Sequence, residues 1–226
     1  MTTNITVAGF SPLFPHAHCN SKYSVCQITT GESEINAAAS ITALYLSPLF
    51  NLKKTYFLIA GIGGVNPYHG TLGSAAFARY AIQVALQYEF DAREIPSNFT
   101  TGYFALGSSG PGQYPSSIYG TEVFELNVNL RDKAVSLAAD VKLNDSTDAI
   151  AYRAKYDYAP ANEPPKVTVG DSATSDVYYS GALLGESFGN FTALLTNGTG
   201  VYVTTAQVYL TPAALISRKI MLRWKR

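Results

Sequence analysis

The longest apolar run of the chain breaks into a cluster of glycines. Tyr56–Ala60 is continuously apolar or aromatic, which predicts a buried strand, and Gly61, Gly63 and Gly64 follow it within four positions. Ligands of open α/β sheets bind at the carboxyl ends of strands, and glycine lets backbone N–H groups approach an anion or a ribose closely. We therefore interpret this loop as a candidate ligand site. A simple turn after a strand is the alternative.

Periodic segments elsewhere predict three helices. Apolar residues recur at helical spacing after Gly31, and Pro48 ends that pattern. A second helix is expected over residues 121–141, where apolar positions recur among charged ones. A third is expected over residues 175–196, although each of its glycines lowers helix propensity by about 1 kcal/mol relative to alanine.

Short apolar segments predict the strands. We expect strands at residues 25–29, 166–169 and 201–205. Residues 75–91 fit either a helix or two strands, and we favour strand for the second half because apolar and aromatic residues alternate there. Strands that alternate with helices predict an α/β fold, with a mostly parallel or mixed central sheet and flanking helices.

Two segments have no regular period. Residues 1–22 are rich in turns, and residues 96–119 form a loop rich in glycine and proline. A loop of that length in a compact domain is usually functional or inserted.

The charges are unevenly distributed along the chain. The 226 residues are 47% hydrophobic and carry no formal net charge, which fits one large or two small globular domains. Five of the 16 basic residues lie among the last nine, where there is no acid, so residues 1–217 carry 11 basic and 16 acidic groups. That balance argues against nucleic acid as a partner, because phosphate backbones require clustered Lys and Arg.

Other signals bear on compartment and cofactors. The longest near-continuous apolar run, Tyr56–Val65, is about half of the roughly 20 residues that a membrane helix requires, and the first ten residues lack the pattern of a secretory signal. Cys19 and Cys26 form either one disulfide or two free thiols. The histidine and acidic residues have no spacing typical of metal ligands, so we expect no metal and no cofactor. Five Asn-x-Ser/Thr sequons are compatible with a secreted or vacuolar glycoprotein, and they begin at Asn4, Asn98, Asn144, Asn190 and Asn197.

Long segments of the chain resemble a known family. The segments are FSPLFPHAHC, CQITTGESEINAAASITALYLSPLF, TYFLIAGIGGVNP, GTLGSAAFARYAIQVALQYEFDAREIP and YGTEVFELN. They are similar to signature segments of the fungal purine nucleoside permease family, over about residues 4–207. More remotely, GESEINAA followed by AGIGG resembles the helix start and glycine loop of the nucleoside phosphorylase and nucleosidase superfamily.

The resemblance implies roles for individual residues. The backbone of Gly61, Gly63 and Gly64 would supply donors to a substrate. Asn66, Thr71 and Glu32 would also bind it. Asp171 would lie near the base as the catalytic residue, whereas its alternative role is that of a helix N-cap.

The ends of the chain differ from what the superfamily implies. Superfamily members begin with a strand ahead of the aligned region, and family members continue past TTAQ with acidic residues. Here Gln207 is followed by VYLTPAALISRKIMLRWKR, which contains no Asp or Glu. We therefore expect an incomplete nucleoside phosphorylase-like α/β domain over residues 1–207 and a divergent basic tail over residues 208–226.

The function implied by the resemblance is purine nucleoside binding in nucleoside uptake, on a soluble scaffold without a transmembrane span. The alternative is a phosphorylase or hydrolase that cleaves the N-glycosidic bond and is inactive in this form. The expected ligand is a purine nucleoside, with phosphate as a candidate second ligand. An unpaired sheet edge would favour a homo-oligomer.

Overall fold

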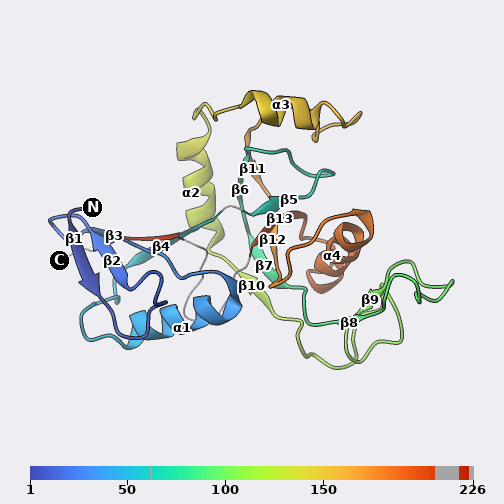
Figure 1. Ribbon diagram of the computed structural model, residues 1–226, viewed down its shortest axis with the longest axis horizontal. Coiled ribbons are helices and arrows are strands. Elements are labelled where there is room, and N and C mark those ends of the chain that lie inside the picture. The colour runs from blue at the N-terminus through green and yellow to red at the C-terminus, as the bar shows by residue number, and fades with distance from the viewer. Residues whose placement is uncertain (62, 207–218, 224–226) are drawn as a thin grey trace. The chain divides into compact units, whose positions relative to one another are not determined.

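Two groups of strands and helices make up the computed structural model, which describes residues 1–61, 63–206 and 219–223 (Figure 1). The chain divides into two compact units. The first unit contains Met1–Gly63 and a C-terminal strand, and the second contains Gly64–Thr205.

A five-stranded sheet forms the first unit. Its order is β1-β2-β3-β14-β4, and every neighbouring pair is antiparallel. The strands are β1 (Thr3–Thr6), β2 (His16–Cys19), β3 (Val25–Ile28), β14 (Lys219–Arg223) and β4 (Tyr56–Ala60). The expected strands at β3 and β4 are confirmed. β14 lies within the predicted basic tail, most of which falls outside the described residues.

One helix packs on this sheet. The expected helix is confirmed as α1 (Ser33–Leu46), and its C-cap residue Ser47 comes just before Pro48. Ile41 and Leu44 of α1 pack against Ile28 of β3 and the cysteines of β2 and β3, and these side chains are almost completely buried. Burial of this apolar surface is the main force that holds helix and sheet together.

A disulfide joins the neighbouring strands β2 and β3. Cys19 and Cys26 lie directly opposite one another in the strand register and are bonded through their sulfur atoms, which decides between the two alternatives left by the sequence. Disulfides persist mainly in oxidising compartments. The asparagines of all five sequons are exposed.

Reducing this disulfide should destabilise the first unit. Loop-closure entropy for a loop this short predicts a loss of about 2–3 kcal/mol in the free energy of unfolding. Urea unfolding with and without a phosphine reductant measures it. The double variant Cys19→Ala/Cys26→Ala is the control, because its unfolding midpoint should not respond to reductant. Equal midpoints for the oxidised and reduced chain would contradict this prediction.

The second unit is built on a mixed sheet of order β10-β7-β12-β13-β5. β12 and β7 are parallel, whereas β10 and β7, and β13 and β5, are antiparallel. The mixed alternative is therefore the correct one, and the sheets are not mostly parallel. The strands are β5 (Gly64–Val65), β7 (Tyr80–Gln83), β10 (Val123–Glu125), β12 (Asp171–Thr174) and β13 (Tyr202–Ala206).

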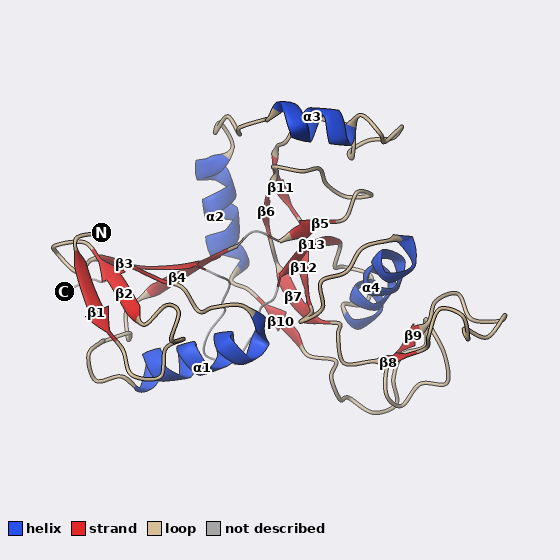
Figure 2. Ribbon diagram, viewed as in Figure 1, coloured by secondary structure: helices blue, strands red, loops and turns tan. Residues whose placement is uncertain are grey.

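Two small sheets and three helices complete the second unit (Figure 2). β6 (Ala75–Phe77) pairs in parallel with β11 (Val167–Val169), and β8 (Tyr88–Glu89) pairs antiparallel with β9 (Tyr103–Phe104). The helices are α2 (Val128–Ala138), α3 (Thr147–Arg153) and α4 (Ala182–Leu195). Phe188 and Phe191 of α4 pack against Ile82, Ala173 and Tyr202 of the mixed sheet.

Several expected elements differ from the observed ones. The helix predicted over residues 121–141 is wrong at its start, because β10 occupies that part and Asn127 caps α2 by accepting from the Leu130 amide. α4 begins later than predicted, and Ser175 lies between β12 and α4. Residues 75–91 form strands in both halves. β1, β2 and α3 were not predicted.

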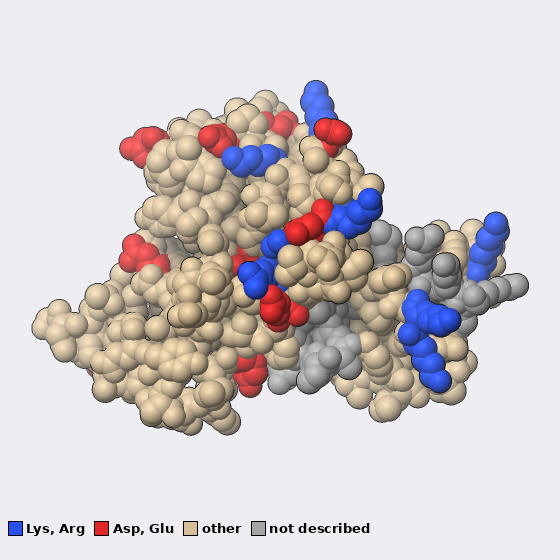
Figure 3. All heavy atoms as spheres, turned by 180° about the vertical axis from the view of Figure 1, so that it is seen from behind, with Lys and Arg blue, Asp and Glu red and all other residues tan. Residues whose placement is uncertain are grey.

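Charged side chains of opposite sign pair on the second unit. Arg79 bonds Glu125 at 2.7 Å, and Arg153 forms a two-pronged pair with Asp145. Hydrogen bonds from Arg153 lower the pKa of Asp145 below its ordinary value. Figure 3 shows acidic and basic side chains lying next to one another on the face that it displays.

Candidate functional site

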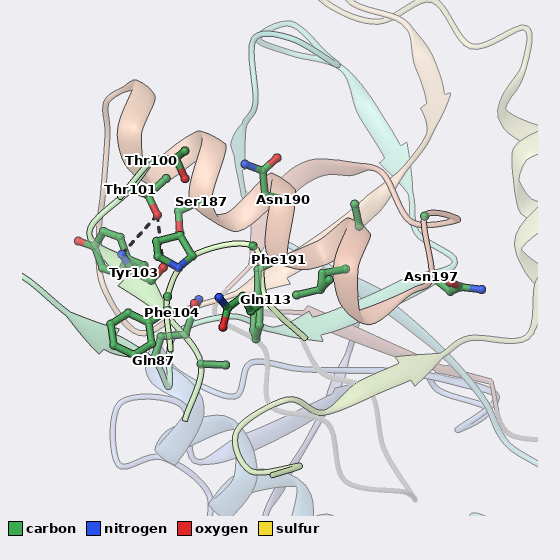
Figure 4. Close-up of a pocket in the computed structure, with 17 residues that line it drawn as sticks. Gln87, Thr100, Thr101, Tyr103, Phe104, Gln113, Ser187, Asn190, Phe191 and Asn197 are labelled. Carbon is green, nitrogen blue, oxygen red and sulfur yellow. Dashed lines mark hydrogen bonds between the residues drawn. The ribbon is translucent and has the colours of Figure 1, made fainter. Parts of the chain in front are cut away.

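A pocket of about 400 Å³ opens on the second unit, between α4 and the long glycine-rich loop. Ser187, Asn190 and Phe191 of α4 form one wall, and Thr101, Tyr103 and Gln113 belong to the opposite one (Figure 4). Pockets of this size are typical of sites for small organic ligands. The loop predicted to be functional or inserted therefore supplies much of the lining.

Aromatic side chains hold this loop in place. Phe104 contacts the rings of Tyr88, Phe90 and Phe99, with ring centroids 5.1–5.8 Å apart. Within the loop, the Gln113 side-chain oxygen accepts hydrogen bonds from the backbone and hydroxyl of Ser109, each at 3.0 Å. The loop is thus ordered by its own packing despite its glycines and prolines.

The described lining of the pocket carries no formal charge. It combines amides and hydroxyls with the rings of Phe104 and Phe191. The Tyr103 hydroxyl donates to Glu89 at 2.9 Å, and burial, reinforced by Glu89, raises the pKa of Tyr103 to about 12. This phenol therefore stays neutral at physiological pH. Such a lining favours a neutral ligand that has both an aromatic face and hydrogen-bonding edges.

Asp171 is buried as a structural anchor. It is the first residue of β12, and its carboxylate accepts hydrogen bonds from the backbone N–H groups of Arg79, Tyr80 and Val201 at 2.7–3.0 Å. These bonds tie the start of β12 to both neighbouring strands. The helix N-cap role is wrong, because Asp171 lies in a strand and α4 starts only at Ala182.

Asn66 and Thr71 are also engaged in the scaffold. The buried Asn66 donates to the Tyr202 carbonyl at 3.2 Å and accepts from the Tyr68 backbone at 3.1 Å. The buried Thr71 hydroxyl donates to the Ala161 carbonyl at 2.9 Å. The hydrogen bonds of these two side chains hold the segment that follows β5 in place.

The predicted glycine loop spans the division between the units. Gly61 and Gly63 follow β4 in the first unit, and Gly64 begins β5 in the second. Glu32 is the extended N-cap residue of α1, and its side chain makes no capping hydrogen bond. The substrate-binding role of the glycine loop therefore stays a prediction.

None of the seven predicted site residues lines the pocket beside α4 or a second pocket in the first unit. The second pocket, of about 300 Å³, lies in the first unit beside the disulfide. Sequence reasoning missed Ser187, Asn190 and Phe191, because α4 appears in the sequence only as an apolar helix. The length of residues 96–119 was the one signal that pointed to the larger pocket.

Within the described ranges, no group of three or more His, Cys, Asp or Glu residues is arranged to hold a metal ion. Among the helices that the structure describes, none combines the length and the apolar character needed to cross a bilayer.

Comparison with known proteins identifies the family. Residues 1–216 match the family model described as purine nucleoside permease (NUP). The chain belongs to the purine nucleoside permease family. It is 49% identical over 208 residues to a purine nucleoside permease of Candida albicans, an alignment that covers 90% of this chain and 51% of that protein.

A second permease relative comes from Schizosaccharomyces pombe. This probable purine nucleoside permease is 44% identical over 212 residues, which cover 90% of this chain and 61% of the relative. The chain thus spans about half to three-fifths of the length of these curated permeases. No solved structure matches it, so the expected nucleoside phosphorylase-like fold stays a prediction.

Proposed function

We propose that this chain binds a purine nucleoside as its contribution to nucleoside transport, and that the pocket between α4 and the long loop is the binding site. Membership of the purine nucleoside permease family carries this proposal. The chain spans only part of its relatives, so we propose its role in transport together with nucleoside binding.

The chemistry of the pocket supports a nucleoside as ligand. Phe104 and Phe191 offer aromatic surface to a purine ring, while the side chains of Gln87 and Gln113 offer donors and acceptors to its edge. Hydroxyls of Ser187 and the loop threonines suit a ribose. No net transfer of charge out of water is needed, because ligand and described lining are both neutral at pH 7.

The same lining favours binding over cleavage of the glycosidic bond. Cationic side chains commonly hold the phosphate in phosphoryl chemistry, and hydrolysis requires a carboxylate or similar base. The described lining contains neither a cationic nor an acidic side chain. Asp171, the predicted catalytic residue, already holds three backbone N–H groups elsewhere in the sheet.

Calorimetry with adenosine, inosine and guanosine tests the proposal. Purine nucleosides should bind at one site per chain, and adenosine monophosphate should bind at least tenfold more weakly because its phosphate meets no cation. Uridine serves as the pyrimidine control. Equal affinity for nucleoside and nucleotide, or no binding of any purine nucleoside, would refute the proposed site.

A variant at the pocket wall tests whether the nucleoside binds in this pocket or elsewhere on the molecule. Ser187 is buried in α4 at the pocket, and Ser187→Ala should weaken nucleoside binding about three- to tenfold, the effect of one neutral hydrogen bond. Ser136→Ala, on the exposed side of α2, is the matched control and should leave affinity unchanged. The same affinity in both variants would place the ligand elsewhere.

A further inference from the structure

Two histidines lie on the same face of the N-terminal sheet. Side chains alternate along β2, so that Ala17 and Cys19 are buried in the core while His16 and His18 remain partly exposed on the opposite face. The two imidazole rings are edge to face, with centroids 6.1 Å apart. Residues two positions apart on a strand point to the same side, so this spacing presents a pair of nitrogen ligands to one ion.

The neighbouring strand β1 supplies a hydrogen-bond partner for each ring. Asn4 pairs with His18 in the strand register, and Nδ1–H of His18 donates to the Asn4 side-chain oxygen at 2.8 Å. Thr6 pairs with His16, and its hydroxyl lies 3.1 Å from Nδ1 of that ring. In each case Nδ1 is engaged and Nε2 is left to act as a ligand.

We propose that His16 and His18 bind a divalent transition metal of the Zn²⁺ or Cu²⁺ class through their Nε2 atoms. A histidine that binds metal typically donates its other ring N–H to a protein oxygen, which orients the ring and raises its basicity. Asn4 and Thr6 provide that arrangement. Imidazole selects zinc, copper and nickel, whereas calcium and magnesium prefer oxygen ligands.

The surroundings leave room for an open coordination sphere. Gln27 of β3 pairs with His18 in the register and lies on the same partly exposed face, where its amide oxygen is a candidate third ligand. Cys19 and Cys26 are bonded to each other on the buried face and cannot contribute thiolates. Water would occupy the remaining positions around the ion.

The sequence predicts turns and no strand over residues 1–22, so the two histidines were not recognised as neighbours on one face. Without a strand, a two-residue spacing has no consequence for ligand geometry, and the sequence therefore predicted no metal. Once β2 is recognised, the same two histidines become neighbours on one surface.

Zinc titration of the whole chain at pH 7.5 tests the site. The unmodified chain and the control variant His69→Gln, which removes the exposed histidine of the second unit, should bind one Zn²⁺ with equal affinity. His16→Gln and His18→Gln should each weaken binding at least tenfold. Equal affinity in all four proteins, or loss of binding in His69→Gln alone, would overturn the proposal.

Two further measurements distinguish ligation from a structural effect. Electron paramagnetic resonance of the Cu²⁺-loaded chain should show two equivalent nitrogen ligands, and one of them should disappear in His18→Gln. Asn4→Ala should weaken zinc binding about tenfold, the usual effect of removing a ligand's hydrogen-bond partner, while the melting temperature stays the same. A copper spectrum without imidazole nitrogen would refute the site even if some zinc binds.

Discussion

Replacing Asp171 with alanine should lower the free energy of unfolding by at least about 3 kcal/mol. The substitution leaves three backbone N–H groups without their acceptor, and each buried unsatisfied donor costs about 1–3 kcal/mol. These donors lie at or immediately before the starts of β7 and β13, the two strands that flank β12, so the sheet of the second unit loses its common anchor. Chemical denaturation followed by circular dichroism measures the loss.

Two matched variants sharpen this experiment. Asp171→Asn keeps one acceptor oxygen and should show an intermediate loss of stability. Asp140→Ala removes an exposed carboxylate of the same unit and should change stability by no more than about 0.5 kcal/mol. If Asp171→Asn were as stable as the unmodified chain yet lost an enzymatic turnover, Asp171 would be a catalytic residue after all.

Replacing Gly170 with alanine should also cause a large loss of stability. A Cβ atom at this position would lie 2.0 Å from Cγ2 and 2.7 Å from Cβ of Val203 on β13. Val203 is almost completely buried, so its side chain has little free space into which it can move. Gly170→Ala should therefore cost about 2–3 kcal/mol through overpacking, as measured by thermal or urea unfolding.

A double-mutant cycle identifies the cause of this loss. Val203→Ala removes the atoms that clash, so the double variant should be at least about 1 kcal/mol more stable than the sum of the two single effects predicts. Gly185→Ala is the control, and its expected change in the free energy of unfolding has the opposite sign. It lies in α4 with nothing within 4 Å of its Cβ, and it should stabilise the chain by up to about 1 kcal/mol. Simple additivity of Gly170→Ala and Val203→Ala would refute the clash.

The sequence predicted those helices and strands that are specified mainly by their own residues. Tyr56–Ala60 is a continuous apolar run, and α1 combines a helical period with a proline that stops it, so both were predicted from the sequence. β1 and β2 were not, because their polar residues alternate with few apolar ones and the strands are specified by pairing with each other and β3. In β10, strand pairing with β7 overrides the helical pattern that continues into α2.

The candidate site was less accessible to sequence reasoning than the fold. The glycines after β4 attracted attention because they fit a general rule about strand ends, whereas the described pocket depends on α4 meeting a loop about 80 residues earlier in the chain. Asp171 and Asn66 were singled out as a catalytic and a substrate-binding residue because of the family resemblance, and those roles stay predictions. Their significance in the structure is that buried polar groups must be hydrogen-bonded, and here the partners are backbone groups of distant strands.

The position of β14 has a consequence for the order of folding during protein synthesis. β14 pairs with both β3 and β4, so these two strands are joined only through a segment made after the whole second unit. During synthesis on the ribosome, the second unit can complete its own sheet before β14, the strand that pairs with both β3 and β4, has been made. The N-terminal sheet should therefore acquire its native protection against proteases later than the second unit does.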